Sequence, residues 1–176
     1  MEKRRWMWLS VGVILIATAA IAGEKKASKT VTMTAASGAV LGTATIEQEK
    51  EGGVEIQLSL HGLTPGEHAL HFHQTASCIG PDFKSAGGHF NPTAAHHGLN
   101  NPSGPHAGDM DNFMVGPDGT AHMTVSNPRV TLEPGQPNSL LSNGGTALVI
   151  HAKADDLMSD PAGNAGDRVG CGVITP

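Results

Sequence analysis

Short stretches of alternating apolar and polar residues recur along the chain after residue 30, and turn residues separate them. Residues 54–60 (VEIQLSL) show the pattern most clearly, with Val, Ile and Leu at every second position. Such alternation places the apolar side chains on one face of a β-strand. No segment here shows a sustained helical period. We therefore expect about eight short strands, at residues 30–35, 40–48, 54–60, 67–73, 112–116, 120–126, 146–151 and 168–174.

Two long loops interrupt these strands. Residues 74–111 are rich in Gly, Pro and His, and residues 152–167 are acidic and contain Gly. Loops of this length in a compact domain usually carry function. Together with the many short strands, they predict an all-β fold, an antiparallel sandwich or barrel with two long functional loops.

The amino terminus differs from the rest of the chain. Residues 1–5 are basic, residues 6–22 are almost continuously apolar, and Ala20 and Ala22 suit a signal-peptidase site. This layout predicts a signal peptide over 1–22, with an N-terminal membrane anchor through 6–22 as the alternative. Residues 23–29 are polar and predict a linker. In both cases we expect residues 30–176 to form one exported domain, in an extracellular, cell-envelope or periplasmic location.

Composition and charge narrow the classes of function. Hydrophobic residues make up 39% of the chain and charged residues 15%, which suits one folded core rather than a disordered chain. The formal net charge is −5, and residues 1–22 contribute +2 of it, so the exported part carries −7. Such a domain cannot neutralise phosphates, and we expect no nucleic-acid partner. The two cysteines, Cys78 and Cys171, favour one disulfide over two free thiols in an oxidising compartment.

Ten histidines in a chain without Tyr raise the question of metal binding. His71 and His73 end one predicted strand, and both rings would project from the same face because alternate strand residues point to one side. His151 ends another strand. Pairs of parallel imidazoles suit a transition metal.

The loop at residues 74–111 supplies further ligands. His89 follows two glycines, His96 and His97 are adjacent, and His106 precedes Asp109 by three positions. Imidazole and carboxylate ligands together suit Zn²⁺, and a bound zinc would order a loop this long.

Five motifs follow one another along residues 71–174: HFH, GGHFNP, HAGD, HAKADD and GNAGDRVGCGVI. In this order they resemble the copper/zinc superoxide dismutase family, and the similarity extends over residues 30–176. The resemblance implies an eight-stranded antiparallel Greek-key barrel or sandwich. It also implies an enzyme that converts superoxide to oxygen and hydrogen peroxide, with copper and zinc as cofactors.

The resemblance also implies a role for individual residues. The copper ligands would be His71, His73, His89 and His151. The zinc ligands would be His89, His97, His106 and Asp109, with His89 bridging both metals as an imidazolate. His97 is preferred to His96 because the family has Gly after this ligand, and Gly98 follows His97. Asp155 would link ligands of both metals, and Cys78 and Cys171 would form the family disulfide. Arg168 would attract superoxide beside the copper. The catalytic residues would therefore be Arg168 and the bridging His89.

Other functions and partners stay open at this point. A dismutase-like, zinc-binding envelope protein with little copper or activity is the main alternative, although His fills all four copper positions. A copper carrier would use soft Cys or Met ligands, and neither Cys lies in a metal motif. His61, His68 and His122 match no motif and are expected on the surface or in strands, with His68 close to the copper pair. Residues 152–167 contain Lys153 as their only lysine, which predicts weak electrostatic steering of superoxide. We expect the protein to be a monomer or a homodimer.

Overall fold

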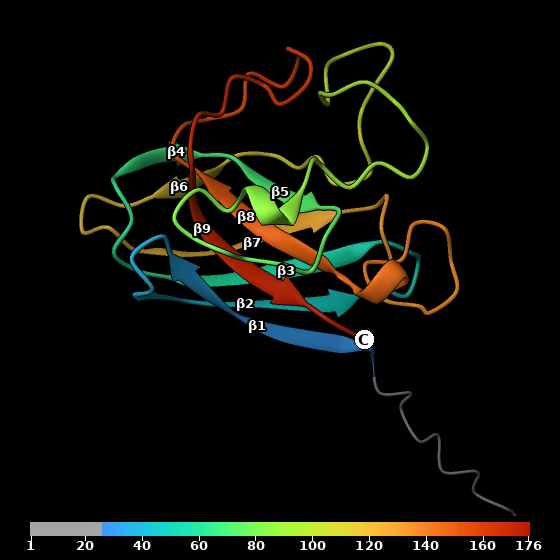
Figure 1. Cartoon of the computed structure of the whole chain (residues 1–176), viewed down its shortest axis with the longest axis horizontal. Coiled ribbons are helices and arrows are strands. Elements are labelled where there is room, and N and C mark those ends of the chain that lie inside the picture. Colours follow the sequence, from blue (N-terminus) through green and yellow to red (C-terminus); the bar gives the residue numbers. More distant parts are fainter. Residues whose placement is uncertain (1–25) are drawn as a thin grey trace, which may run out of the picture.

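The computed structural model describes residues 26–176, and this part of the chain is all-β (Figure 1). The predicted fold class is therefore confirmed. Two 3₁₀ turns, η1 (Lys84–Ala86) and η2 (Ser142–Gly144), lie in loops. The nine strands of the described residues are β1 (Ser28–Ala35), β2 (Val40–Gln48), β3 (Val54–Leu60), β4 (Gly66–His68), β5 (Leu70–His73), β6 (Phe113–Val115), β7 (Ala121–Asn127), β8 (Thr146–His151) and β9 (Arg168–Ile174).

Seven strands form one curled antiparallel sheet, in the order β5-β8-β9-β1-β2-β3-β7. The last strand thus pairs with the first, at Thr34 and Cys171. The predicted strand 67–73 is divided at Ala69, because β4 pairs with β6 in a separate two-stranded sheet while β5 pairs with β8. The loop at residues 74–111 follows β5 and the loop at residues 152–167 follows β8, and because these strands are antiparallel the two loops begin at opposite ends of the pair. Both then project beyond the same side of the curled sheet (Figure 1).

Strand β8 is buried on both faces, which explains why its sequence is a continuous apolar run. Leu148 and Ile150 point into the main core. Ala147 and Val149 pack instead against Phe83, which lies in the loop after β5. The first long loop therefore covers the outer face of β8 and has an apolar contact of its own.

A disulfide between Cys78 and Cys171 fixes the same loop to β9, with the two Cα atoms 5.7 Å apart. The predicted bond is therefore formed. It joins positions 93 residues apart in the chain and lies beside β8.

The amino-terminal predictions fall mostly outside the described residues. Strand β1 begins at Ser28, two positions before the expected start of the domain. The signal peptide or anchor over residues 1–22 lies outside the described part. Among residues 26–176 the structure contains no helix of the length and hydrophobicity needed to cross a membrane.

Candidate metal centre

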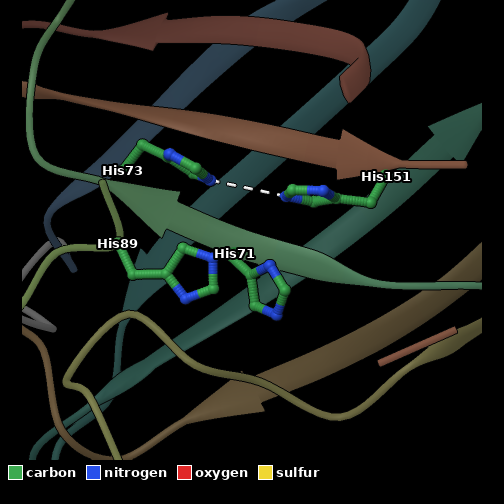
Figure 2. Close-up of side chains that lie close together, drawn as sticks. All are labelled: His71, His73, His89 and His151. Atoms are coloured by element: carbon green, nitrogen blue, oxygen red, sulfur yellow. Dashed lines mark hydrogen bonds between the residues drawn. The ribbon is translucent and has the colours of Figure 1, made fainter. Parts of the chain in front are cut away.

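Four buried histidines meet beside the antiparallel strand pair β5 and β8 (Figure 2). His71 and His73 come from β5, and His151 ends β8. His89 lies in the loop after β5 and forms an isolated antiparallel β-bridge with His73. One ring nitrogen from each lies within 4.8 Å of the corresponding nitrogens of the others. Alternation along β5 explains the pair, because Phe72 between them enters the main core. We call these four residues the first group.

Hydrogen bonds at the far side of each ring show which nitrogen is left for a metal. His73 donates from Nδ1 to the Gly87 carbonyl at 2.9 Å, and His151 donates from Nδ1 to the Gly166 carbonyl at 3.2 Å. Their Nε2 atoms face each other at 3.4 Å, as the dashed line in Figure 2 marks. Nδ1 of His71 and Nε2 of His89 are buried and have no hydrogen-bond partner among residues 26–176. Unpaired buried nitrogens are costly, and a cation at the centre of the first group would satisfy them.

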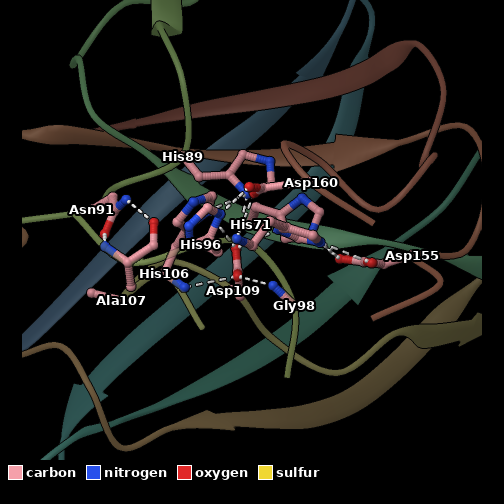
Figure 3. Close-up of polar contacts among 12 residues, drawn as sticks. His71, His89, Asn91, His96, Gly98, His106, Ala107, Asp109, Asp155 and Asp160 are labelled. Carbon is pink, nitrogen blue, oxygen red and sulfur yellow. Dashed lines mark hydrogen bonds and ion pairs between the residues drawn. The ribbon is translucent and has the colours of Figure 1, made fainter. Parts of the chain in front are cut away.

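A second group forms around one carboxylate oxygen (Figure 3). Oδ1 of Asp109 lies 2.8 Å from Nδ1 of His89, 3.1 Å from Nδ1 of His97 and 3.3 Å from Nδ1 of His106. Its other oxygen accepts the backbone N–H groups of Gly98 and His106 at 2.9 and 3.0 Å. Asp109 is therefore held by the loop backbone while Oδ1 stays directed at three imidazoles, a donor set that suits tetrahedral zinc.

The two groups are connected twice. His89 belongs to both, with Nδ1 in the second group and Nε2 in the first. Asp155 accepts from Nε2 of His71 at 2.7 Å and from Nε2 of His97 at 3.1 Å. Burial raises the pKa of Asp155, but the hydrogen bonds from His71 and His97 outweigh it and hold this pKa below its usual range. Asp155 thus remains a carboxylate that orients one ring of each group.

Arg168 lies at the start of β9, opposite His151 in the strand register. Its guanidinium donates to the carbonyls of Phe83 and Gly87 at 2.8 and 2.7 Å, and Gly87 also accepts from His73. The residue is half-buried and borders a hollow of about 580 Å³ that opens to solvent. A positive charge is therefore held between solvent and the first group. The hollow is lined by Ala36, Pro81, Asp82, Lys84, Gly166, Asp167 and Arg168.

Residues 40–174 match the family model described as copper/zinc superoxide dismutase. The chain belongs to the copper/zinc superoxide dismutase family. It is 49% identical over 164 residues to "Superoxide dismutase [Cu-Zn] 2" of Aquifex aeolicus, covering 93% of this chain and 94% of that one. It is 40% identical to the superoxide dismutase-like protein YojM of Bacillus subtilis, covering 78% and 70%.

Solved structures agree with this dismutase-family assignment. The crystal structure of a dismutase-like protein from Bacillus subtilis superposes with a TM-score of 0.79 at 39% identity, covering 82% of this chain and 96% of that one. The Cu/Zn superoxide dismutase from Brucella abortus gives a TM-score of 0.70 at 28% identity, with 84% and 99% covered.

Within the dismutase-family site, the structure separates the adjacent His96 and His97. His97 is fully buried in the second group. His96 points outward, with 62% of its side chain exposed, and pairs with Asp160. His61 and His122 lie on the surface, as expected for residues outside the motifs.

Several further residues support the dismutase-family site through contacts that the sequence does not specify, although the sequence places His68 near His71 and His73 and has Gly163 in the motif GNAGDRVGCGVI. His68 is buried, and its Nδ1 donates to the carbonyl of His151 at 2.7 Å. Asn112 holds the backbone of Asp155 through two hydrogen bonds, one in each direction. Gly163 packs so closely that a Cβ there would lie 1.7 Å from Oδ1 of Asp155. Contacts of this kind arise only when distant segments meet.

The imidazoles of the dismutase-family site differ in proton affinity. Burial lowers the pKa of His89 to about 4 and that of His151 to about 3, and it holds the pKa of His73 well below its usual value. These rings are neutral at pH 7, so each offers a lone pair to a metal. Burial acts in the same direction on His97, but the neighbouring carboxylates of Asp109 and Asp155 outweigh it and raise this pKa to about 9. A metal in the second group would therefore displace a proton.

Proposed function

We propose that this chain dismutates superoxide to oxygen and hydrogen peroxide. Copper would bind the first group (His71, His73, His89 and His151), and zinc would bind the second (His89, His97, His106 and Asp109). The observation that carries the proposal is the position of His89, whose two ring nitrogens face the two groups. A relative of this chain in Aquifex aeolicus is named a [Cu-Zn] superoxide dismutase.

The donor chemistry supports this division of metals. Four imidazole nitrogens and no carboxylate make up the first group, a set that suits copper. Three imidazole nitrogens and one carboxylate oxygen make up the second, which suits a closed zinc site. Carbonyls or carboxylates hold the outer nitrogens of His71, His73, His151 and His97 and so fix their ring orientations.

The protein's own residues would then carry substrate binding and proton transfer. Bound copper would supply one-electron exchange with superoxide. Arg168 would hold the anion between the hollow and the first group, because its guanidinium is fixed by two carbonyls. His89 would hold a proton at Nε2 only while that nitrogen is not bound to copper, and it would give this proton to the reduced product, since Nε2 is buried and has no hydrogen-bond partner among the described residues. Two superoxide anions and two protons thus yield one oxygen and one hydrogen peroxide.

The second candidate is a dismutase-like protein that holds zinc and little copper. It is considered because the chain is similar in structure to a dismutase-like protein of Bacillus subtilis. The complete set of four buried imidazoles in the first group favours the active enzyme instead.

Metal content and activity together would test the proposal. The purified chain is expected to bind one copper and one zinc and to remove superoxide only when copper is supplied. His151→Ala should lower kcat/KM at least a hundredfold, with zinc retained, because it removes a ligand of the first group alone. His122→Ala is the matched control, since His122 is exposed and bonded only to Ser59. Full activity in His151→Ala would contradict the copper assignment.

We further propose that the domain works outside the cytoplasm. The disulfide between Cys78 and Cys171 supports this location, since such bonds persist in oxidising compartments. Fractionation of cells that express the full chain, with and without residues 1–22, would test it. Recovery of both forms in the cytoplasm would contradict it.

A further inference from the structure

His97 is held at both ends by one loop, residues 152–167. Its ring Nε2 donates to Asp155 at 3.1 Å, and its backbone N–H donates to Oδ1 of Asp160 at 2.7 Å. Asp155 has a place in the family motif, whereas Asp160 has none. His97 is fully buried with Asp160 in place, and its N–H is bonded to that carboxylate, so without Asp160 this N–H would lose its protein partner.

The second oxygen of Asp160 accepts from Nδ1 of His96 on the outer side of the loop. Figure 3 shows His96 and Asp160 beside the second group. One carboxylate therefore contacts two consecutive residues whose side chains point in opposite directions, His96 to solvent and His97 to the interior. This arrangement fixes the orientation of the peptide between them.

Two further hydrogen bonds support this contact, one within the loop at residues 74–111 and one between the two long loops. Asn101 donates from its side chain to the carbonyl of His97 at 2.9 Å, so both backbone groups of His97 are bonded. The backbone N–H of Asn100 donates to the carbonyl of Leu157 at 2.9 Å. The backbone of the ligand is thus anchored to the neighbouring loop, and its ring is anchored separately by Asp155.

We propose that Asp160 is a positioning residue for the second metal group, acting through the backbone of His97. This inference rests on the proposed zinc site. A ring restrained at its backbone and at its outer nitrogen keeps Nδ1 directed at Oδ1 of Asp109, 3.1 Å away. Asp160 therefore slows the release of zinc, because His97 must leave this orientation before the metal can leave.

The test measures the rate at which the zinc-loaded full chain releases zinc to an excess of a chromogenic chelator. Asp160→Ala should release zinc on the order of tenfold faster than the wild type. Asp160→Asn should lie between them, since its amide oxygen can still accept from the His97 N–H. Cobalt placed in the second group gives an independent readout, and Asp160→Ala should alter its visible absorption bands.

Asp118→Ala is the matched control. Asp118 is also an exposed carboxylate that accepts a backbone N–H, from Thr120 at 3.1 Å, but it lies in the turn between β6 and β7. The zinc-release rate of Asp118→Ala should equal that of the wild type. Equal rates in the wild type and Asp160→Ala would overturn the inference while leaving the zinc site intact.

Two further outcomes are decisive. If Asp160→Ala fails to fold, Asp160→Leu decides, because leucine has a similar shape and no acceptor for the His97 N–H, and a rate equal to the wild type together with unchanged cobalt bands would overturn the inference. A wild-type chain that binds no zinc at His97 would overturn both the proposed function and this inference.

Discussion

At the scale of single residues, the site depends on which nitrogen of each imidazole is occupied. Nδ1 of His73 and of His151 is bonded to a carbonyl, whereas Nε2 of His71 is bonded to a carboxylate. The remaining nitrogens converge although the rings come from different segments. Ring orientation is therefore set by the outer hydrogen bonds as much as by the position of each residue in the chain.

Gly163 shows how tightly these outer bonds are enclosed. A Cβ at this position would lie 1.7 Å from Oδ1 of Asp155 and 2.7 Å from Nε2 of His97. We expect Gly163→Ala to displace Asp155 and to weaken zinc binding roughly tenfold or more. Competition with a chelator of known affinity measures this change.

Gly135→Ala is the matched control for Gly163→Ala. Gly135 also has a positive φ, of +80° compared with +61°, but nothing lies within 4 Å of the position that a Cβ would take there. Both substitutions carry the backbone cost of about 1 kcal/mol for a left-handed residue. Only Gly163→Ala should affect zinc, and equal zinc affinities in the two variants would contradict the steric argument.

The sequence predicts which side chains gather in the two groups better than it predicts the residues that hold them. His71 and His73 can be paired from strand alternation alone, and the choice of His97 over His96 comes from the family resemblance, which has Gly after this residue. The hydrogen bonds of His68 and Asp160 cannot be predicted in this way, although the sequence places His68 near His71 and His73. Both depend on contacts between segments more than sixty residues apart, His68 with His151 and Asp160 with His97. No local pattern specifies such contacts.

At the scale of elements, the predicted strands agree with the observed ones within a few residues. The exception is the run 67–73, which continues through Ala69 in the sequence but is divided between β4 and β5. Alternation reports which side chains are buried, and it does not report which strand is the neighbour. The division follows from pairing, since β4 joins β6 and β5 joins β8.

The loop that follows β5 carries both the disulfide and the carbonyl groups that hold Arg168, so it affects stability as well as catalysis. The disulfide ties it to β9, and its Phe83 and Gly87 carbonyls hold Arg168. We expect Cys78→Ser/Cys171→Ser to lower the free energy of unfolding by up to about 4–5 kcal/mol, the loop-entropy value for so long a loop. It should also lower kcat/KM severalfold, because Arg168 loses its fixed position.

Urea unfolding and steady-state assays measure these two effects. Chemical reduction of the wild type is the control, since it breaks the same bond without changing the sequence. An unchanged kcat/KM in both the double variant and the reduced wild type would show that Arg168 is positioned independently of the disulfide.

At the scale of the whole molecule, charge opposes the approach of an anion. Residues 23–176 carry −7, from a chain total of −5 less the +2 of residues 1–22. The hollow beside the site is locally neutral, since Lys84 and Arg168 offset Asp82 and Asp167. Lys84 comes from the loop after β5, so the lysine count of residues 152–167 alone does not describe the field at the entrance. The neutral balance nevertheless leads to the same expectation of weak steering.

Substitution of one charge in the hollow separates local field from net charge. Asp82 pairs with Lys84 at 3.0 Å, and Asp82→Asn would leave the hollow with an excess of one positive charge. We expect its kcat/KM to rise severalfold at low salt and to fall toward the wild-type value near physiological ionic strength, where the Debye length is about 8 Å. The wild type should show only a shallow dependence on salt. Asp118→Asn is the control, because it changes the net charge equally but lies in the β6–β7 turn and not in the hollow. An equal rise in kcat/KM in Asp118→Asn would mean that total charge, rather than the field of the hollow, controls the approach of superoxide.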